Sequence, residues 1–177
     1  SRLSMAFKDV AKKKGERDTL WGLLTQVHSE QRAHAVVIGG AAGVGKSRLC
    51  QWIAQRASET GAGQLLTARF SGADDADAAL RNMLLRRFQA QGLEEQDLTE
   101  RLDYALDELR VRNPELRQHA HTLLSGSKLQ GASRYVVIRL LLEAISAERP
   151  AILVLDDVHA GIDGLRFARH LLNAQVV

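Results

Sequence analysis

One glycine-rich run constrains this chain more than any other feature of its sequence. Gly40, Gly43 and Gly45 stand where a tightly turning backbone needs positive φ angles, and a lysine and a serine follow at once. Such a loop turns its peptide N–H groups around a phosphate, while the lysine ammonium reaches the β- and γ-phosphates and the serine hydroxyl binds Mg²⁺. The complete run, which predicts a loop that binds a nucleoside triphosphate, is Gly40, Ala41, Ala42, Gly43, Val44, Gly45, Lys46 and Ser47.

The residues on either side of this loop support the prediction. An apolar run predicts a strand over residues 34–38, and apolar residues at helical spacing, among them Leu49 and Ile53, predict a helix that begins at Lys46. This helix adds the positive end of its dipole to the phosphate site. Arg48, in its first turn, is also counted with the loop as a nucleotide-binding candidate. Lys46, which meets the phosphate charge, is a catalytic candidate as well.

Two aspartates form the second chemical signal. Asp156 and Asp157 directly follow residues 151–155, an apolar run typical of a strand buried on both faces of a parallel sheet. Such a strand holds a carboxylate firmly at its carboxyl end, so Asp156 is a candidate ligand of Mg²⁺, directly or through water. Asp157 is a catalytic candidate that polarises an attacking water toward the γ-phosphate. The alternative is that both acids only cap the helix that begins near Asp163 or hydrate a loop.

The remaining patterns predict an α/β fold. A helix is expected over residues 16–27, a second strand over residues 64–70 and the third strand over residues 151–155. Between the second and third strands, leucine stripes at helical spacing predict an all-helical insert over about residues 73–148. We expect a three-layer P-loop nucleoside triphosphatase domain over residues 16–177, with helices flanking a short parallel sheet.

Capping residues mark the ends of helices within the insert. Asp74 and Asp75 are expected to cap its first helix. Asn113 and Pro114 have the chemistry that begins a helix, and Gly126 has the conformational freedom that ends one. The sequence therefore predicts a helix between Asn113 and Gly126.

Composition and charge narrow the class of protein. The 24 lysines and arginines against 21 acids give a net charge of +3, which is too even to indicate a nucleic-acid partner. No apolar run reaches the ~20 residues that span a bilayer, so we expect a cytoplasmic protein without a membrane partner. Residues 1–15 form a basic segment, either a solvated terminus or an arm that binds polyanions. Cys50, the only cysteine, is expected to be a packing residue.

Taken together, these motifs resemble the STAND-like AAA ATPase domain of bacterial signalling regulators. The similar segments are the loop with Arg48 and Leu49, then residues 153–159, and residues 15–21, which are similar to the family's entry motif. The family includes domains fused to Ser/Thr protein kinases, nucleotide cyclases or LuxR-type DNA-binding domains. The resemblance covers residues 16–172. It implies binding of ATP and Mg²⁺ and slow hydrolysis, coupled to conformational switching or self-assembly, with protein partners or self-association.

The chain also departs from the family pattern. Lys12, Lys13 and Lys14 stand where the family has an apolar residue, Gly and Arg, and Ala160 stands where it has a Trp. Family members continue into a strand that carries the sensor-1 polar residue and then into a helical lid. That strand lies between the phosphate-loop strand and the Asp156 strand. We therefore expect a fragment of a longer regulator, which binds ATP with weak or no hydrolysis.

Two other classes of function stay open. One is a scaffold that binds a nucleotide and never hydrolyses it, which a turnover assay distinguishes. The other is a DNA-handling ATPase of the origin-recognition or transposition type, which the basic segment favours although no DNA-reading motif is present. Salt-dependent binding to duplex DNA distinguishes this one. His159 is either a sensor of the nucleotide state or an exposed loop histidine.

Overall fold

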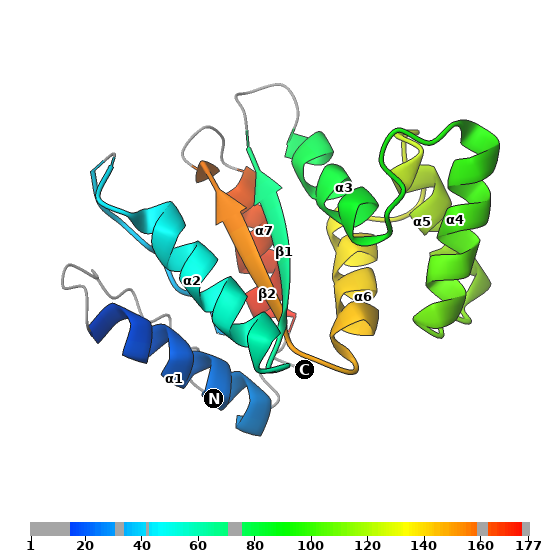
Figure 1. Ribbon diagram of the computed structural model, residues 1–177. Helices are drawn as coiled ribbons and strands as arrows, with labels where there is room; N and C mark the ends of the chain where they lie inside the picture. The colour runs from blue at the N-terminus through cyan, green and yellow to red at the C-terminus, as the bar shows by residue number, and fades with distance from the viewer. Residues whose placement is uncertain (1–14, 31–33, 42, 71–75, 159–162, 175–177) are drawn as a thin grey trace.

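The computed structural model describes residues 15–30, 34–41, 43–70, 76–158 and 163–174 (Figure 1). Its elements, labelled as in the figure, are α1 (Gly15–Glu30), α2 (Lys46–Glu59), β1 (Gln64–Arg69), α3 (Ala76–Arg87), α4 (Glu95–Glu108), α5 (Pro114–Leu124), α6 (Arg134–Ser146), β2 (Ala151–Asp156) and α7 (Asp163–Asn173). None of the helices in these ranges is long and apolar enough to cross a membrane. The fold is mixed α/β, as the sequence predicts, and α7 lies behind the two strands in the view of Figure 1.

A parallel pair of strands forms the sheet. β1 and β2 pair in a register that runs from Gln64 opposite Ala151 to Arg69 opposite Asp156. Because the strands are parallel, their carboxyl ends meet at the same edge, which is where ligands bind in open α/β sheets. The register therefore brings Arg69 beside the predicted metal acid.

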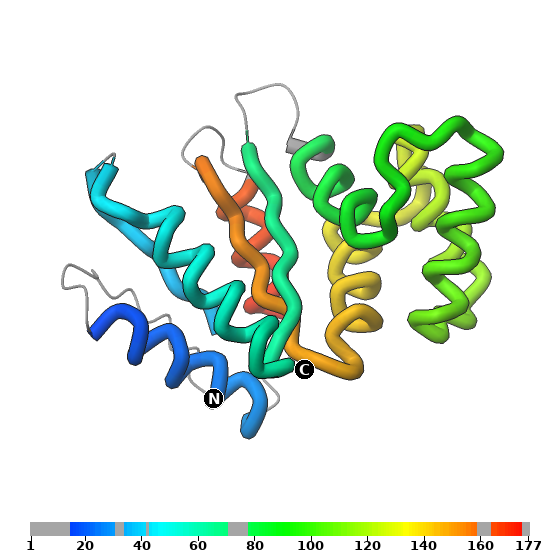
Figure 2. Tube along the Cα trace, viewed as in Figure 1, coloured from blue at the N-terminus to red at the C-terminus, as the bar shows by residue number. Residues whose placement is uncertain are grey.

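The prediction of a strand over residues 34–38 is wrong. Residues 34–41 carry no strand, and within the described part of the chain the sheet consists of β1 and β2 alone. A strand needs a neighbour that accepts and donates its backbone hydrogen bonds, and apolar sequence does not supply one. Val37 accordingly is 49% exposed. Figure 2 shows the chain passing through this segment and turning back at the glycine-rich loop into α2.

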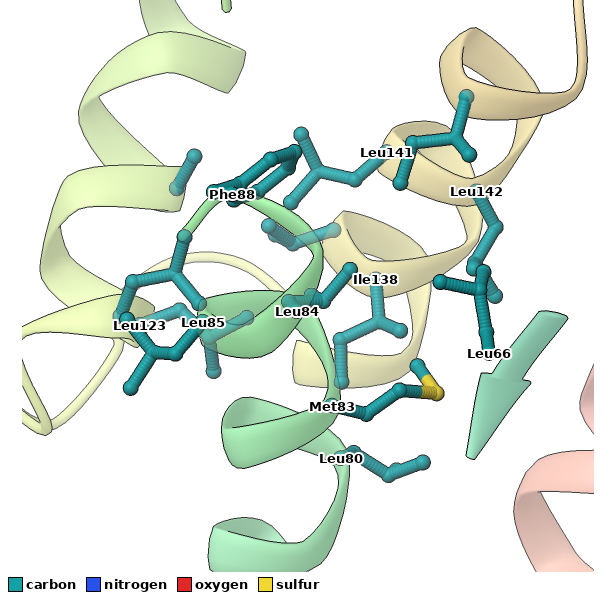
Figure 3. Close-up of a cluster of buried hydrophobic side chains, with 14 of the residues drawn as sticks. Leu66, Leu80, Met83, Leu84, Leu85, Phe88, Leu123, Ile138, Leu141 and Leu142 are labelled. Atoms are coloured by element: carbon teal, nitrogen blue, oxygen red, sulfur yellow. The ribbon is translucent and has the colours of Figure 1, made fainter. Parts of the chain in front are cut away.

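The main hydrophobic core lies between β1 and the helices α3 to α6 (Figure 3). Leu66 and Ala68 point into it from β1, because alternate side chains of a strand face the same side. An apolar stripe at helical spacing on and just after α3 is buried in this core and consists of Leu80, Met83, Leu84 and Phe88. Each fully buried side chain of this size stabilises the fold by roughly 1.5–3 kcal/mol. This packing holds β1, and through it β2, against the helices.

The predicted helix ends near α5 are confirmed. The Leu116 N–H donates to the Asn113 side-chain oxygen at 3.0 Å, and Pro114 occupies the first turn. Gly126 has φ +84°, the left-handed conformation that favours glycine after a helix. Asp74 and Asp75, the predicted caps of the first helix in this region, lie outside the described residues.

A second, smaller cluster joins α1 to α2. Ile53 of α2 is buried there, with Trp21 of α1 and Trp52 of α2 packed against it. Each tryptophan also faces an arginine of the other helix. Cζ of Arg17 lies 5.2 Å from the Trp52 ring centroid, and Cζ of Arg56 lies 5.7 Å from that of Trp21. Cation–π contacts at partly exposed sites contribute about 0.5–1 kcal/mol each. α1 therefore braces the helix that follows the glycine-rich loop.

Candidate functional site

The phosphate loop, residues 40–47, has an unusual backbone at its three glycines. Gly40 has φ +146°, Gly43 has φ +81° and Gly45 has φ +99°, a region that residues with a Cβ rarely adopt. A Cβ on Gly40 would also lie 2.9 Å from Cγ2 of Val44. The positive φ angles expected from the sequence are therefore confirmed. Ala42, the remaining alanine of the predicted loop, lies outside the described residues.

Lys46 folds back over this loop. Its Nζ donates hydrogen bonds to the carbonyl oxygens of Gly40 and Ala41, at 2.8 and 2.9 Å. An ammonium group has three N–H donors, and two of them thus hold the loop around the charge. The Lys46 ammonium is therefore held against the loop by two hydrogen bonds.

A cavity of about 430 Å³ opens beside the loop. It is lined by Gly43, Gly45, Lys46, Ser47, Arg48 and Gln51. The sequence singled out every one of these residues except Gln51. The sequence could have identified Gln51 as a lining residue. It lies three residues after Arg48 and four after Ser47, and residues at these spacings share one face of a helix.

Asp156 ends β2 and pairs with an arginine that sequence analysis missed. Nη2 of Arg69, the last residue of β1, lies 3.3 Å from Oδ2 of Asp156. The arginine side chain is 71% exposed and the carboxylate 33% exposed, so this ion pair holds the acid only lightly. The sequence does carry a sign of this pair, because both predicted strands end in or beside a charged residue. In the structure, Arg69 and Asp156 are opposite one another in the register of the two strands.

Asp156 also lies near the helix that carries the phosphate loop. Burial raises the pKa of the Cys50 thiol, and the negative charge of Asp156 raises it further. Cys50 lies in the second turn of α2, three residues after Ser47. Cys50 is partly buried, in agreement with the predicted packing role.

Asp157 has a backbone conformation that only a few residue types tolerate. Its φ is +57°, and its N–H donates to Oδ1 of Asp156 at 3.1 Å. Asp and Asn enter this left-handed region more readily than other residues with side chains, because their short polar groups form local hydrogen bonds. The side chain of Asp157 is exposed, while His159 and Ala160 lie outside the described residues.

The residues at this site fit a nucleotide with its magnesium ion. Ser47 offers a hydroxyl at the start of α2 and Asp156 a carboxylate, both of which are oxygen ligands that Mg²⁺ prefers. Within the described residues, no group of three or more His, Cys, Asp or Glu side chains could hold a metal by itself. Mg²⁺ bound by one or two protein ligands keeps its other positions for phosphate and water.

Comparison with known protein families gives one match. The family model described as the AAA ATPase domain matches residues 12–175 of this chain. No curated protein and no solved structure matches it. The matched region includes the phosphate loop and both aspartates, and covers far more than half of the chain.

Proposed function

Because this chain belongs to the AAA ATPase domain family, we propose that it binds Mg·ATP at residues 40–47 and hydrolyses it slowly, as the regulatory module of a signal-transduction protein. The family implies nucleotide binding and hydrolysis. The observation that carries the ATP-binding proposal is the positive-φ glycine loop, closed around the Lys46 ammonium and open to a cavity of about 430 Å³. A cavity of this size falls within the range of small-molecule sites.

Each site residue has a proposed role. Lys46 releases its two carbonyl partners and binds the β- and γ-phosphates, together with the loop N–H groups of residues 40–47. Ser47 and Asp156 hold Mg²⁺, which neutralises phosphate charge when it is bound. Arg69, through its ion pair with Asp156, positions that carboxylate for the ion. Asp157 accepts a hydrogen bond from the attacking water and orients it.

The signalling part of the proposal rests on resemblance. Residues 15–21 and 153–159 are similar to STAND-like regulators, which couple the nucleotide state to switching or self-association. We further propose that residues 16–177 form the nucleotide-binding domain, preceded by a basic segment over residues 1–15. Residues 1–14 lie outside the described part of the chain.

A scaffold that binds without hydrolysis is the second candidate. Residues 34–41 carry no strand, so the phosphate loop is not anchored to the sheet from its amino-terminal side within the described residues. Catalysis requires the loop and Asp157 to be held within a fraction of an ångström of each other, whereas binding tolerates looser geometry. Phosphate release from saturating Mg·ATP separates the two candidates, since the scaffold releases none above the Lys46→Ala background.

Lys46→Ala tests the binding proposal. We expect saturating Mg·ATP to raise the melting temperature of the wild-type chain and to leave that of Lys46→Ala unchanged. Removing the ammonium leaves phosphate charge unpaired, a loss of roughly 2–5 kcal/mol that is enough to abolish micromolar binding. Lys128→Ala, which removes an exposed lysine on the loop after α5, is the matched control. Mg·ATP should raise its melting temperature as much as that of wild type. Equal shifts in wild type and Lys46→Ala would refute the proposed site.

A further inference from the structure

The cavity beside the phosphate loop extends along the surface of α2. Gly43, Gly45 and Lys46 line it at the phosphate loop, where the Lys46 ammonium bonds the carbonyl oxygens of Gly40 and Ala41. Arg48 and Gln51 line it further along α2, where they lie on one face of its first two turns. Both side chains are exposed, and neither forms a hydrogen bond or ion pair with any residue that the structure describes. The lining of the cavity therefore combines the phosphate loop with polar groups of α2 that have no partner among the described residues.

These two unused groups differ in chemistry. The Arg48 guanidinium is a permanent cation with several N–H donors, which suits a phosphate oxygen. Gln51 carries a neutral amide, with two N–H donors and one carbonyl acceptor. A neutral amide gains less than a guanidinium does from a phosphate, but it pairs well with an uncharged group that offers a hydrogen-bond donor beside an acceptor. The nucleoside part of a nucleotide contains groups of this kind, and its triphosphate does not.

Adenine offers the matching pattern. Its outer edge presents the N6 amine as a donor beside N7 as an acceptor, and a glutamine amide can bond both at once. Guanine presents two acceptors, O6 and N7, at the same edge, so the amide carbonyl of a glutamine would face an acceptor there. A glutamine at this end of the cavity can therefore distinguish the two purines.

We infer that Gln51 is a specificity-determining residue, which reads the adenine base of the bound nucleotide while Arg48 contacts the phosphate nearest the ribose. This inference rests on the proposed function, because it assumes that the triphosphate occupies the phosphate loop. It adds to that proposal a preference for adenine over guanine nucleotides, which the Gln51 amide would cause.

The test compares three probes on the 177-residue chain by titration calorimetry: Mg·ATP, Mg·GTP and Mg·tripolyphosphate, which has no base. In Gln51→Ala we expect the affinity for Mg·ATP to fall about tenfold, the value of one bidentate amide–base contact, and the preference for ATP over GTP to disappear. Affinity for tripolyphosphate should stay as in wild type. Gln51→Met keeps the length of the side chain without its hydrogen bonds, so it should behave like Gln51→Ala with respect to the ATP to GTP ratio.

Gln55→Ala is the matched control. Gln55 lies one turn further along α2, does not line the cavity, and donates to Glu59 Oε1 at 2.8 Å. It should bind all three probes like wild type.

The possible contrary results are distinct. An unchanged ratio of ATP to GTP affinity in Gln51→Ala overturns the inference and leaves the proposed function intact. The same holds if Gln51→Ala weakens ATP and tripolyphosphate equally, because the residue then acts at the phosphate end, or if Gln51→Met restores the wild-type ratio. A wild-type chain that binds none of the three probes overturns the proposed function, and this inference with it.

Discussion

Asp157 combines a rare backbone conformation with a proposed catalytic role. At φ +57°, a residue such as Ala would cost roughly 1–2 kcal/mol of backbone strain, whereas Asn tolerates the left-handed region as Asp does. Asn is therefore the substitution that removes the charge without moving the backbone. The same replacement at Asp156 removes a charge from a residue in ordinary strand conformation. Neither substitution therefore strains the backbone, although Asp156→Asn also removes the charge that pairs with Arg69.

We predict that the two acids fail in different ways. Asp156→Asn should weaken Mg²⁺-dependent ATP binding itself, because the ion loses a carboxylate ligand. Asp157→Asn should bind Mg·ATP like wild type and lower turnover by about 10²-fold or more, a typical effect of losing general-base assistance. Calorimetry measures the first quantity and phosphate release the second. Wild-type turnover in Asp157→Asn would remove this residue from the mechanism.

At the scale of elements, α7 docks through a glycine. A Cβ on Gly164 would lie 2.9 Å from Cε2 of Phe70 and 3.0 Å from Cγ1 of Val158. One turn later, Phe167 is fully buried, and its ring centroid lies 5.5 Å from that of Tyr135 on α6. The close approach at Gly164 therefore sets how deeply Phe167 enters the core.

Two glycine-to-alanine substitutions separate this docking from helix propensity. Gly22 lies in α1, and no other group lies within 4 Å of the position that an added Cβ would take. Gly22→Ala should therefore raise the free energy of unfolding by about 0.5–1 kcal/mol. Gly164→Ala, in the first turn of α7, gains less helix propensity and forces the Phe70 ring and the helix apart, so we expect a net loss of about 1–3 kcal/mol. Urea denaturation of both variants measures the difference. A stabilising effect of Gly164→Ala would show that α7 is not held at this distance.

A charged network ties α4 to α5. Oδ1 of Asp103 lies 3.0 Å from Nε2 of His121 and accepts from Nη2 of Arg117 at 2.8 Å. The hydrogen bond with His121 is the largest of the effects that lower the pKa of Asp103, and Arg117 adds to it, while partial desolvation opposes them. Because the folded-state pKa is the lower one, this network stabilises the fold above the unfolded-state pKa of about 3.9 and stops doing so as pH falls through the folded-state value.

We therefore predict a pH-dependent effect of Asp103→Asn. At pH 7 the variant should lose up to about 1 kcal/mol of unfolding free energy, a limit set by the 48% exposure of the carboxylate. The difference from wild type should begin to shrink below about pH 4, where the unfolded-state carboxylate takes up its proton, and should be lost only as pH falls through the lower folded-state pKa. Urea denaturation across this range, repeated at high salt to screen the charges, measures it. A difference that is constant with pH would assign the effect to packing instead.

At the scale of the whole molecule, the sheet has an edge with no partner among the described residues. In the register of β1 and β2, the Gln64 N–H donates to the Pro150 carbonyl and the Phe70 N–H to the Asp156 carbonyl. A ladder with this alternation directs the backbone groups of Leu153 and Leu155 away from β1. Unpaired strand edges with aliphatic side chains invite association with another strand.

We predict that amide exchange in β2 follows this alternation. Hydrogen–deuterium exchange measured by NMR should show protected N–H groups at Ile152 and Val154 and faster exchange at Leu153 and Leu155, because only the first two face β1. Protection of Leu153 and Leu155 that rises with protein concentration would indicate self-association at this edge. Equal protection of all four in a dilute sample would mean that a further strand is already paired there. The strand that the family resemblance places between the phosphate-loop strand and the Asp156 strand stays a prediction.

Much of this protein follows from its sequence, because the interactions involved are local. Helical periodicity located the helices, and the capping chemistry of Asn113 and Gly126 located two of their ends. The glycine positions of the phosphate loop predicted the positive φ angles at Gly43 and Gly45, since only glycine adopts them at little cost. These features depend on neighbours a few residues apart, which a single sequence displays.

Other features were decided only by tertiary structure, because they depend on residues far apart in the chain. The apolar run over residues 34–38 has strand composition but lacks a strand partner in the described fold, and no local pattern reveals a missing neighbour. Arg69 meets Asp156 across 87 positions of sequence because two strands fall into register. Gln51 joined the candidate site because a folded loop opened a cavity against its face of α2. The sequence by itself determined which chemical groups the chain carries and which local backbone it prefers, whereas the partners of those groups were set by packing between distant segments.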